Sequence, residues 1–186
     1  MRMFVIAAAL SALISGPASA ADAPAELLMP PDIPVTDKDG HTEGFVTRLR
    51  PRGPVIISFF YTSCESLCDV TNGILYGVDQ IVMEENGEPI TLVSLSIDPM
   101  SDTPATLHAN AANFSPSEEW LWLTAGMRGT DPLLDGLGVS FDSIFAHDPM
   151  FLVGDFCSSR FIRVIGLPEP ELLIEMARKI PECVAG

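Results

Sequence analysis

Residues 55–68 read VIISFFYTSCESLC, an almost continuously apolar run followed by two cysteines, Cys64 and Cys68, four residues apart. An apolar run such as 55–61 is typical of a strand that is covered on both faces of a sheet. Apolar residues then recur at helical spacing from Leu67 to Val82, which predicts a helix of about four to five turns that ends before Gly87. The stretch therefore predicts a central strand that leads into a helix, with the cysteine pair at the junction.

The other predicted elements lie on both sides of this unit. Further strands are predicted at 90–97, 120–123, 150–153 and 161–165, and the last two form a hairpin. Further helices are predicted from Pro104 to about Phe114, in a short segment opened by Asp131-Pro132, and at 172–180. The turn signal Asp37-Lys38-Asp39-Gly40 predicts an earlier hairpin. This order predicts one α/β domain, a three-layer α/β/α sandwich with an N-terminal hairpin extension.

The first 20 residues have the pattern of a secretory signal peptide. Arg2 precedes an apolar run from Met3 to Ile14, roughly 12 residues, which is shorter than the roughly 20 needed to span a bilayer. Ala18-Ser19-Ala20 supplies small residues at the cleavage positions. We expect residues 1–20 to be removed, 21–34 to form an extended lead-in and 35–186 to form the domain. The mature chain is then expected to be periplasmic and soluble, with no integral membrane span.

The charge balance excludes one class of partner. The chain has 25 Asp and Glu against 10 Lys and Arg, a formal net charge of −15. Such a charge repels phosphate backbones and anionic headgroups, so nucleic acid is not an expected partner.

The cysteine pair is suited to two kinds of chemistry. The unpaired N–H groups and the dipole at a helix N-terminus favour the thiolate, which binds metals and attacks disulfides. The CxxxC spacing differs from the CxxC of thioredoxin-like redox motifs and lets two sulfurs chelate an ion, yet it does not forbid a disulfide. Two inert buried cysteines are the alternative, but a junction at the exposed end of a sheet is a place where ligands bind.

Three segments carry a family resemblance: FYTSCESLC at 60–68, SLSIDPMSDTP at 94–104 and HDPMFLVG at 147–154. They resemble the Sco/SenC family of copper-binding cytochrome oxidase assembly proteins, and the resemblance covers roughly 31–180 in the family's order. It implies a thioredoxin-like fold and identifies His147 as a third copper ligand beside Cys64 and Cys68. Two thiolates and one imidazole suit Cu(I) and accommodate Cu(II), and zinc fits the same set. We expect one copper ion per chain.

The chain departs from the family pattern in two places. Asp69 stands where the family usually has proline, and the membrane anchor that many members keep is expected to be lost here. Pro149 resembles in position the cis-proline that faces the cysteines in thioredoxin folds. Asp98 and Asp102 are interpreted as strand-end and cap residues. The remaining residues that could bind a metal are assigned to the hairpin turn, a helix and the core: His41, His108 and Met150.

The other two cysteines are predicted to form a structural disulfide. Cys157 is expected to end the first strand of the late hairpin, and Cys183 follows the last helix. Strand 161–165 advances about 17 Å and the helix returns about 16 Å, so the two ends can meet. Closing this 27-residue loop is worth roughly 3.5 kcal/mol in the chain-entropy model.

Two functions follow from these residues. In the first, the protein is a periplasmic metallochaperone, not an enzyme, that delivers copper to the dinuclear copper site of a respiratory oxidase subunit or to a similar cuproprotein. In the second, it is a thiol-disulfide oxidoreductase in which Cys64 attacks and Cys68 resolves, so that a partner's copper-ligand cysteines stay reduced. The two separate at His147, because copper transfer needs its nitrogen and disulfide exchange does not.

Overall fold

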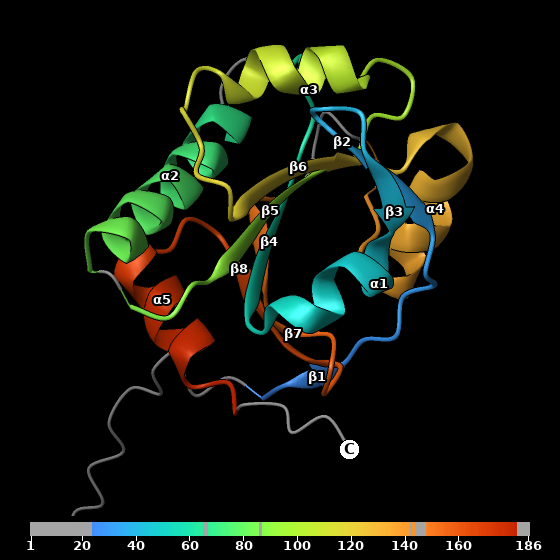
Figure 1. Cartoon of the computed structure of the whole chain (residues 1–186). Coiled ribbons are helices and arrows are strands. Elements are labelled where there is room, and N and C mark those ends of the chain that lie inside the picture. The colour runs from blue at the N-terminus through green and yellow to red at the C-terminus, as the bar shows by residue number, and fades with distance from the viewer. Residues whose placement is uncertain (1–23, 65–66, 86, 142, 144–147, 182–186) are drawn as a thin grey trace, which may run out of the picture.

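The computed structural model describes residues 24–181 except 65–66, 86, 142 and 144–147, and it leaves out the side chains of 67 and 68. Its centre is a sheet of eight strands in the order β1-β8-β7-β4-β5-β6-β2-β3 (Figure 1). The strands are β1 (Glu26–Leu27), β2 (Pro34–Asp37), β3 (Thr42–Gly44), β4 (Val55–Phe60), β5 (Thr91–Ser96), β6 (Trp120–Thr124), β7 (Met150–Asp155) and β8 (Arg160–Ile165). The helices are α1 (Phe45–Leu49), the 3-10 helix η2 (Arg50–Arg52), α2 (Leu67–Glu85), α3 (Pro104–Ala111), α4 (Gly126–Gly136) and α5 (Pro170–Arg178).

Strand β4 lies in the middle of the sheet, as its apolar run predicts. All six of its residues are buried. It pairs in parallel with β5, with Ile57 opposite Val93, and antiparallel with β7, with Ile57 opposite Leu152. Because β6 continues the parallel set, the carboxyl ends of β4, β5 and β6 lie at one edge of the sheet.

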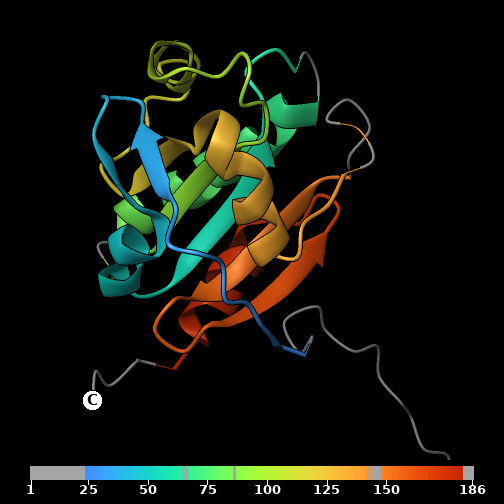
Figure 2. The same cartoon turned by 90° about the vertical axis from the view of Figure 1, so that its right-hand side faces the viewer.

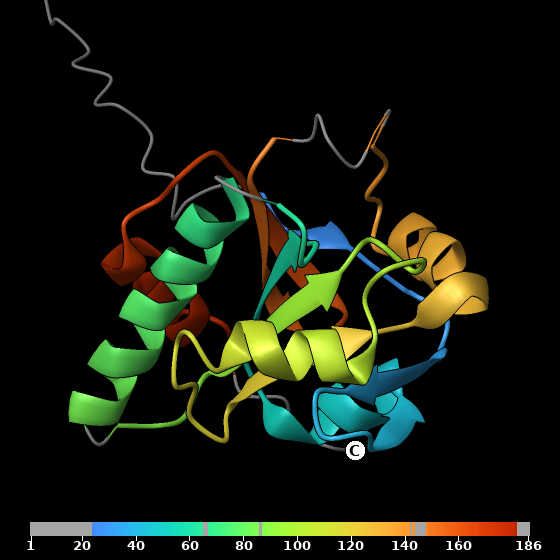
Figure 3. The same ribbon diagram turned by 90° about the horizontal axis from the view of Figure 1, so that it is seen from above.

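Helices cover both faces of the sheet. Helices α2 and α5 pack together on one face, and α1 and α4 lie on the other (Figure 1 and Figure 3). Helix α3 is on the side of α2. The Ser94 hydroxyl of β5 donates to Asn72 of α2 and accepts from Trp120, whose ring contacts that of Phe114 just after α3, with centroids 5.7 Å apart. The three-layer α/β/α architecture predicted from the sequence is confirmed.

The N-terminal hairpin is also confirmed. Strands β2 and β3 pair around a turn in which the Gly40 N–H donates to the Asp37 carbonyl at 3.0 Å. Burial on its own raises the pKa of the Asp37 carboxyl, but hydrogen bonds from Arg48 and from the backbone N–H groups of His41 and Asp39 outweigh it and hold the pKa below its usual range. The carboxylate therefore fastens the turn to α1.

The lead-in is more structured than the expected extended segment. Its described part contains β1, which pairs with β8, and it passes over α4 on the same face of the sheet (Figure 2). A Cβ on Gly136 of α4 would lie 2.6 Å from the Cα of Pro30, so the glycine lets the lead-in approach closely.

The differences from the prediction include the boundaries of α4 and β7 and the additional helix α1. Helix α4 begins at Gly126, before the expected start at Asp131, and keeps Pro132 in its interior because Leu133 and Leu134 bury against the core. Helix α1 was not predicted, since its five residues are too few to show a period. Strand β7 ends at Asp155, so Cys157 lies in the following turn and not at the end of the strand.

Two glycines of α2 provide a test of its packing against α5. A Cβ on Gly73 would meet no atom within 4 Å, whereas one on Gly77 would lie 2.7 Å from Cγ of Pro170. We expect Gly73→Ala to raise the free energy of unfolding by about 1 kcal/mol, because alanine favours the helix. Gly77→Ala gains the same propensity but must displace Pro170, so we expect a net loss of about 1 kcal/mol. Urea denaturation measures both changes, and equal shifts in the two variants would contradict the close contact.

Candidate metal centre

Cys64 follows the carboxyl end of the central strand. The chain leaves β4 at Phe60, and the Cys64 N–H donates to the Tyr61 carbonyl at 3.2 Å, which closes a turn. The Cys64 side chain is partly buried against the core. Cys68 lies in the first turn of α2. The backbone thus places both cysteines at the junction of β4 and α2, as the sequence predicts.

A buried carboxylate fixes this junction to the neighbouring strand. Asp102 is 4% exposed and accepts hydrogen bonds from the Ser96 hydroxyl at 2.6 Å and the Thr62 hydroxyl at 2.5 Å. The Thr62 N–H also lies 3.2 Å from both of its oxygens. Asp102 therefore joins the end of β5 to the segment that carries Cys64.

This role of Asp102 corrects the interpretation of it as a cap. The N-cap of α3 is Thr103, whose side chain forms a reciprocal capping box with Thr106. Asp98 lies two residues after the end of β5, where its carboxylate accepts from the N–H groups of Met100 and Ser101. Asp102 and Thr62 lie 40 residues apart, so no local pattern predicted the contact.

The segment that contains His147 is bounded by residues at the same edge of the sheet. On one side the Phe141 ring contacts Phe59 near the end of β4, with ring centroids 6.2 Å apart. On the other side β7 begins at Met150, and its next residue, Phe151, pairs with Ser58. His147 itself lies outside the described residues.

Among the cysteines whose side chains the structure describes, Cys64 and Cys157 are each disulfide-bonded. They do not bond to each other. Gly154 pairs with Val55, so Cys157 lies near the start of β4, whereas Cys64 follows its end. The six residues of β4 separate them by about 20 Å, far more than the span of a disulfide. Cys183 lies outside the described residues.

The structure also shows the surroundings of three other residues near the junction: Asp69, Met150 and Pro149. Asp69 is exposed in the first turn of α2, where a carboxylate interacts favourably with the helix dipole. Met150 is partly buried and packs against the edge of the core, and its sulfur accepts from Nη1 of Arg163 at 3.0 Å. The described residues contain no cis peptide bond, so the resemblance of Pro149 to a cis-proline does not extend to its conformation.

The two remaining histidines lie beside carboxylates. Nδ1 of His41 is 3.6 Å from Asp37, and Nδ1 of His108 is 3.4 Å from Asp39. Within the part of the chain that the structure describes, no three His, Cys, Asp or Glu side chains come together as a metal site.

Among the described residues, none of the helices combines the length and the hydropathy that a membrane span requires.

The fold and the cysteine-bearing junction define a thioredoxin-like protein. The sequence pattern of the SCO1/SenC family matches residues 36–138, and the chain belongs to this family. A search of curated protein sequences finds no match.

Structures of Sco proteins have the same fold. Copper-bound ScoI of Arabidopsis thaliana is 17% identical with a TM-score of 0.69, over 83% of this chain and 99% of that chain. Copper-bound ScoI of Bradyrhizobium japonicum is 19% identical with a TM-score of 0.63, over 83% and 100%. BsSco, a cytochrome c oxidase assembly protein with an identified disulfide switch, is 18% identical with a TM-score of 0.67, over 85% and 97%.

Proposed function

We propose that this protein is a periplasmic copper chaperone that binds one copper ion through Cys64, Cys68 and His147. It delivers the ion to the dinuclear copper site of a respiratory oxidase subunit or to a similar cuproprotein. The signal peptide at 1–20 and the domain at 35–186 belong to the same proposal. The observation that carries it is a cysteine pair at the β4–α2 junction in a chain of the SCO1/SenC family.

The position of the junction and the donor set support copper as the cargo. Two soft sulfur ligands and one imidazole suit Cu(I). The strand that follows His147 begins beside the end of β4, so a short connection is enough to bring the imidazole to the cysteines. Two Sco proteins with this fold, from Arabidopsis thaliana and Bradyrhizobium japonicum, have copper bound.

Delivery proceeds by ligand exchange at this edge of the sheet. An acceptor ligand approaches the ion, one ligand of this chain leaves, and the remaining ligands follow in turn. The protein's part is to hold the cysteine segment in place while the bonds exchange. The hydrogen bonds of Asp102 to Thr62 supply that support from β5.

A second candidate function is supported by the disulfide at Cys64. We propose Cys68 as its partner, four residues further on. As a reductase, the Cys64 thiolate attacks a partner disulfide and forms a mixed disulfide, and the Cys68 thiolate then displaces the partner's second sulfur. The partner leaves as a dithiol and this chain keeps the Cys64–Cys68 disulfide. A thiol reductant must then reduce this disulfide to the two thiols before the next cycle.

We also propose that Cys157 pairs with Cys183. Cys157 is disulfide-bonded and lies too far from Cys64 to bond with it. Cys68 lies in the first turn of α2, which follows the carboxyl end of β4, so it too is at the opposite end of β4 from Cys157. Cys183 follows α5, which packs against β7.

His147→Ala distinguishes the two functions. We expect the Cu(I) affinity of the reduced protein, measured by competition with a chromophoric chelator, to fall at least about tenfold. The rate of exchange with a small aromatic disulfide should stay unchanged, because it needs only the two sulfurs. His108→Ala is the matched control, since His108 lies on α3 beside Asp39. Equal Cu(I) affinity of the two variants would rule out His147 as a ligand and leave the reductase.

A further inference from the structure

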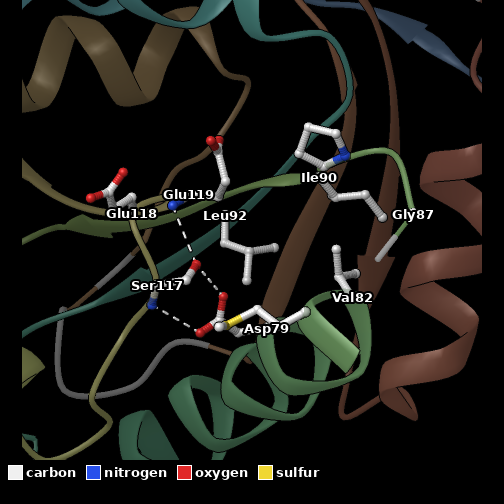
Figure 4. Close-up of a pocket in the computed structure, with 10 residues that line it drawn as sticks. Asp79, Val82, Gly87, Ile90, Leu92, Ser117, Glu118 and Glu119 are labelled. Atoms are coloured by element: carbon white, nitrogen blue, oxygen red, sulfur yellow. Dashed lines mark hydrogen bonds between the residues drawn. The ribbon is translucent and has the colours of Figure 1, made fainter. Parts of the chain in front are cut away.

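A cavity of about 340 Å³, drawn in Figure 4, lies at the C-terminal end of α2. It opens between the last turns of α2, the segment that leads into β5 and the segment before β6. The 15 residues from Cys68 to Met83 place it about 22 Å along the helix from the first turn of α2. The proposed copper chemistry does not use this site.

The floor of the cavity is apolar. Val82 and Met83 of α2 line it together with Ile90 and Leu92 from the start of β5. Met83 is 58% exposed, so apolar surface continues from the cavity onto the outside of the helix. Such a floor fits an aliphatic chain better than a small ion.

The wall of the cavity holds a buried carboxylate that has no cation beside it. Asp79 is 3% exposed and accepts from the Ser117 N–H at 3.0 Å and the Ser117 hydroxyl at 2.5 Å. No Lys, Arg or His of the described residues forms an ion pair with it. A buried negative charge of this kind favours a cation in the adjoining space.

Two further carboxylates lie at the mouth of the cavity. Glu118 is exposed, and among the described residues no cation pairs with it. Glu119 is 3.2 Å from Nη1 of Arg52. No lysine or arginine is among the lining residues, and Arg178, whose Nη2 would lie 3.5 Å from a Cβ on Gly87, is paired with Glu85, so the lining side chains carry only negative charge.

We propose that this cavity binds a lysine or arginine side chain on a basic segment of a partner protein. The aliphatic stem lies on the floor formed by Val82 and Leu92, and the charged head lies between Asp79 and Glu118. A metal ion is a poor occupant, because among the described residues no three His, Cys, Asp or Glu side chains come together as a metal site. A free amine is also a poor occupant, because the exposed Met83 provides surface that only neighbouring residues of a segment can cover.

The test is an NMR titration of the full-length mature protein with the peptide acetyl-Leu-Lys-Leu-amide. We expect saturable amide shifts centred on Gly87, Leu92 and Ser117. The norleucine peptide, which keeps the stem and lacks the ammonium group, should bind at least about threefold more weakly. Butylamine should bind more weakly than the lysine peptide, because it lacks the neighbouring residues.

Matched charge variants separate this cavity from general attraction to an acidic protein. Glu118→Gln should weaken binding of the lysine peptide about threefold, and Glu171→Gln on α5 should leave it unchanged, although both remove one charge. Equal effects of the two variants, or shifts scattered over the surface, would overturn the proposal. If butylamine binds as tightly as the peptide, the occupant of the cavity is a free amine and the proposed partner segment is wrong. None of these outcomes depends on copper binding.

Discussion

Cys64→Ala is expected to lower the copper content of the reduced protein from about one ion per chain to none under competition with a Cu(I) chelator. The change removes one of two sulfur ligands, and the remaining sulfur with one imidazole is a much weaker soft site. Copper is measured by atomic absorption after gel filtration in the presence of the chelator. Cys68→Ala is expected to give the same result.

Cys157→Ser is the control for this experiment. It removes a sulfur at the other end of β4, so it should lower the melting temperature while the copper content stays at one ion per chain. If Cys64→Ala and Cys68→Ala both keep one copper ion per chain, the proposed metal centre is wrong. If Cys157→Ser loses copper while it remains folded, the assignment of the two cysteine pairs is wrong.

Asp102→Ala is expected to lower the free energy of unfolding by about 2–4 kcal/mol. The buried carboxylate accepts from Ser96 and Thr62, and its removal leaves these donors without partners in the interior. Chemical denaturation measures the loss as a shift of the midpoint at an unchanged slope. The Cu(I) affinity should fall as well, because the segment from Thr62 to Cys64 loses its support.

Two further variants serve as comparisons for Asp102→Ala. Asp102→Asn keeps one carbonyl oxygen as an acceptor, so its loss of stability should be smaller than that of the alanine variant. Asp69→Ala removes an exposed carboxylate from the first turn of α2 and should change stability by less than about 1 kcal/mol. An Asp102→Ala protein as stable as the wild type would show that the contact does not hold the cysteine segment.

The sequence predicts the fold well where a pattern is long. The apolar run of β4 and the helical spacing of α2 extend over enough residues to define a central strand and a long helix, and both are confirmed. Helix α1 has only five residues, so it shows no period. Helix α4 contains Pro132, which as a local signal predicts a helix start, but burial of its neighbours keeps the helix intact around it.

The candidate site is predicted in part for a similar reason. The cysteine pair lies within one local motif, and the structure places it at the expected junction. Asp102 and Thr62 meet only after β5 pairs with β4, so their contact depends on the fold and not on spacing. The cavity beside Asp79 arises in the same way, because α2 and the segment before β6 approach each other through Ser117.

The position of Cys157 at the start of β4 has a practical consequence for experiments on surfaces. A tether attached near that turn would stand about 20 Å from the β4–α2 junction, with a fully buried strand between them. An immobilised molecule would therefore present its α2 N-terminus to the solution, and the proposed exchange of copper with a flowing acceptor could be tested on an electrode or sensor chip.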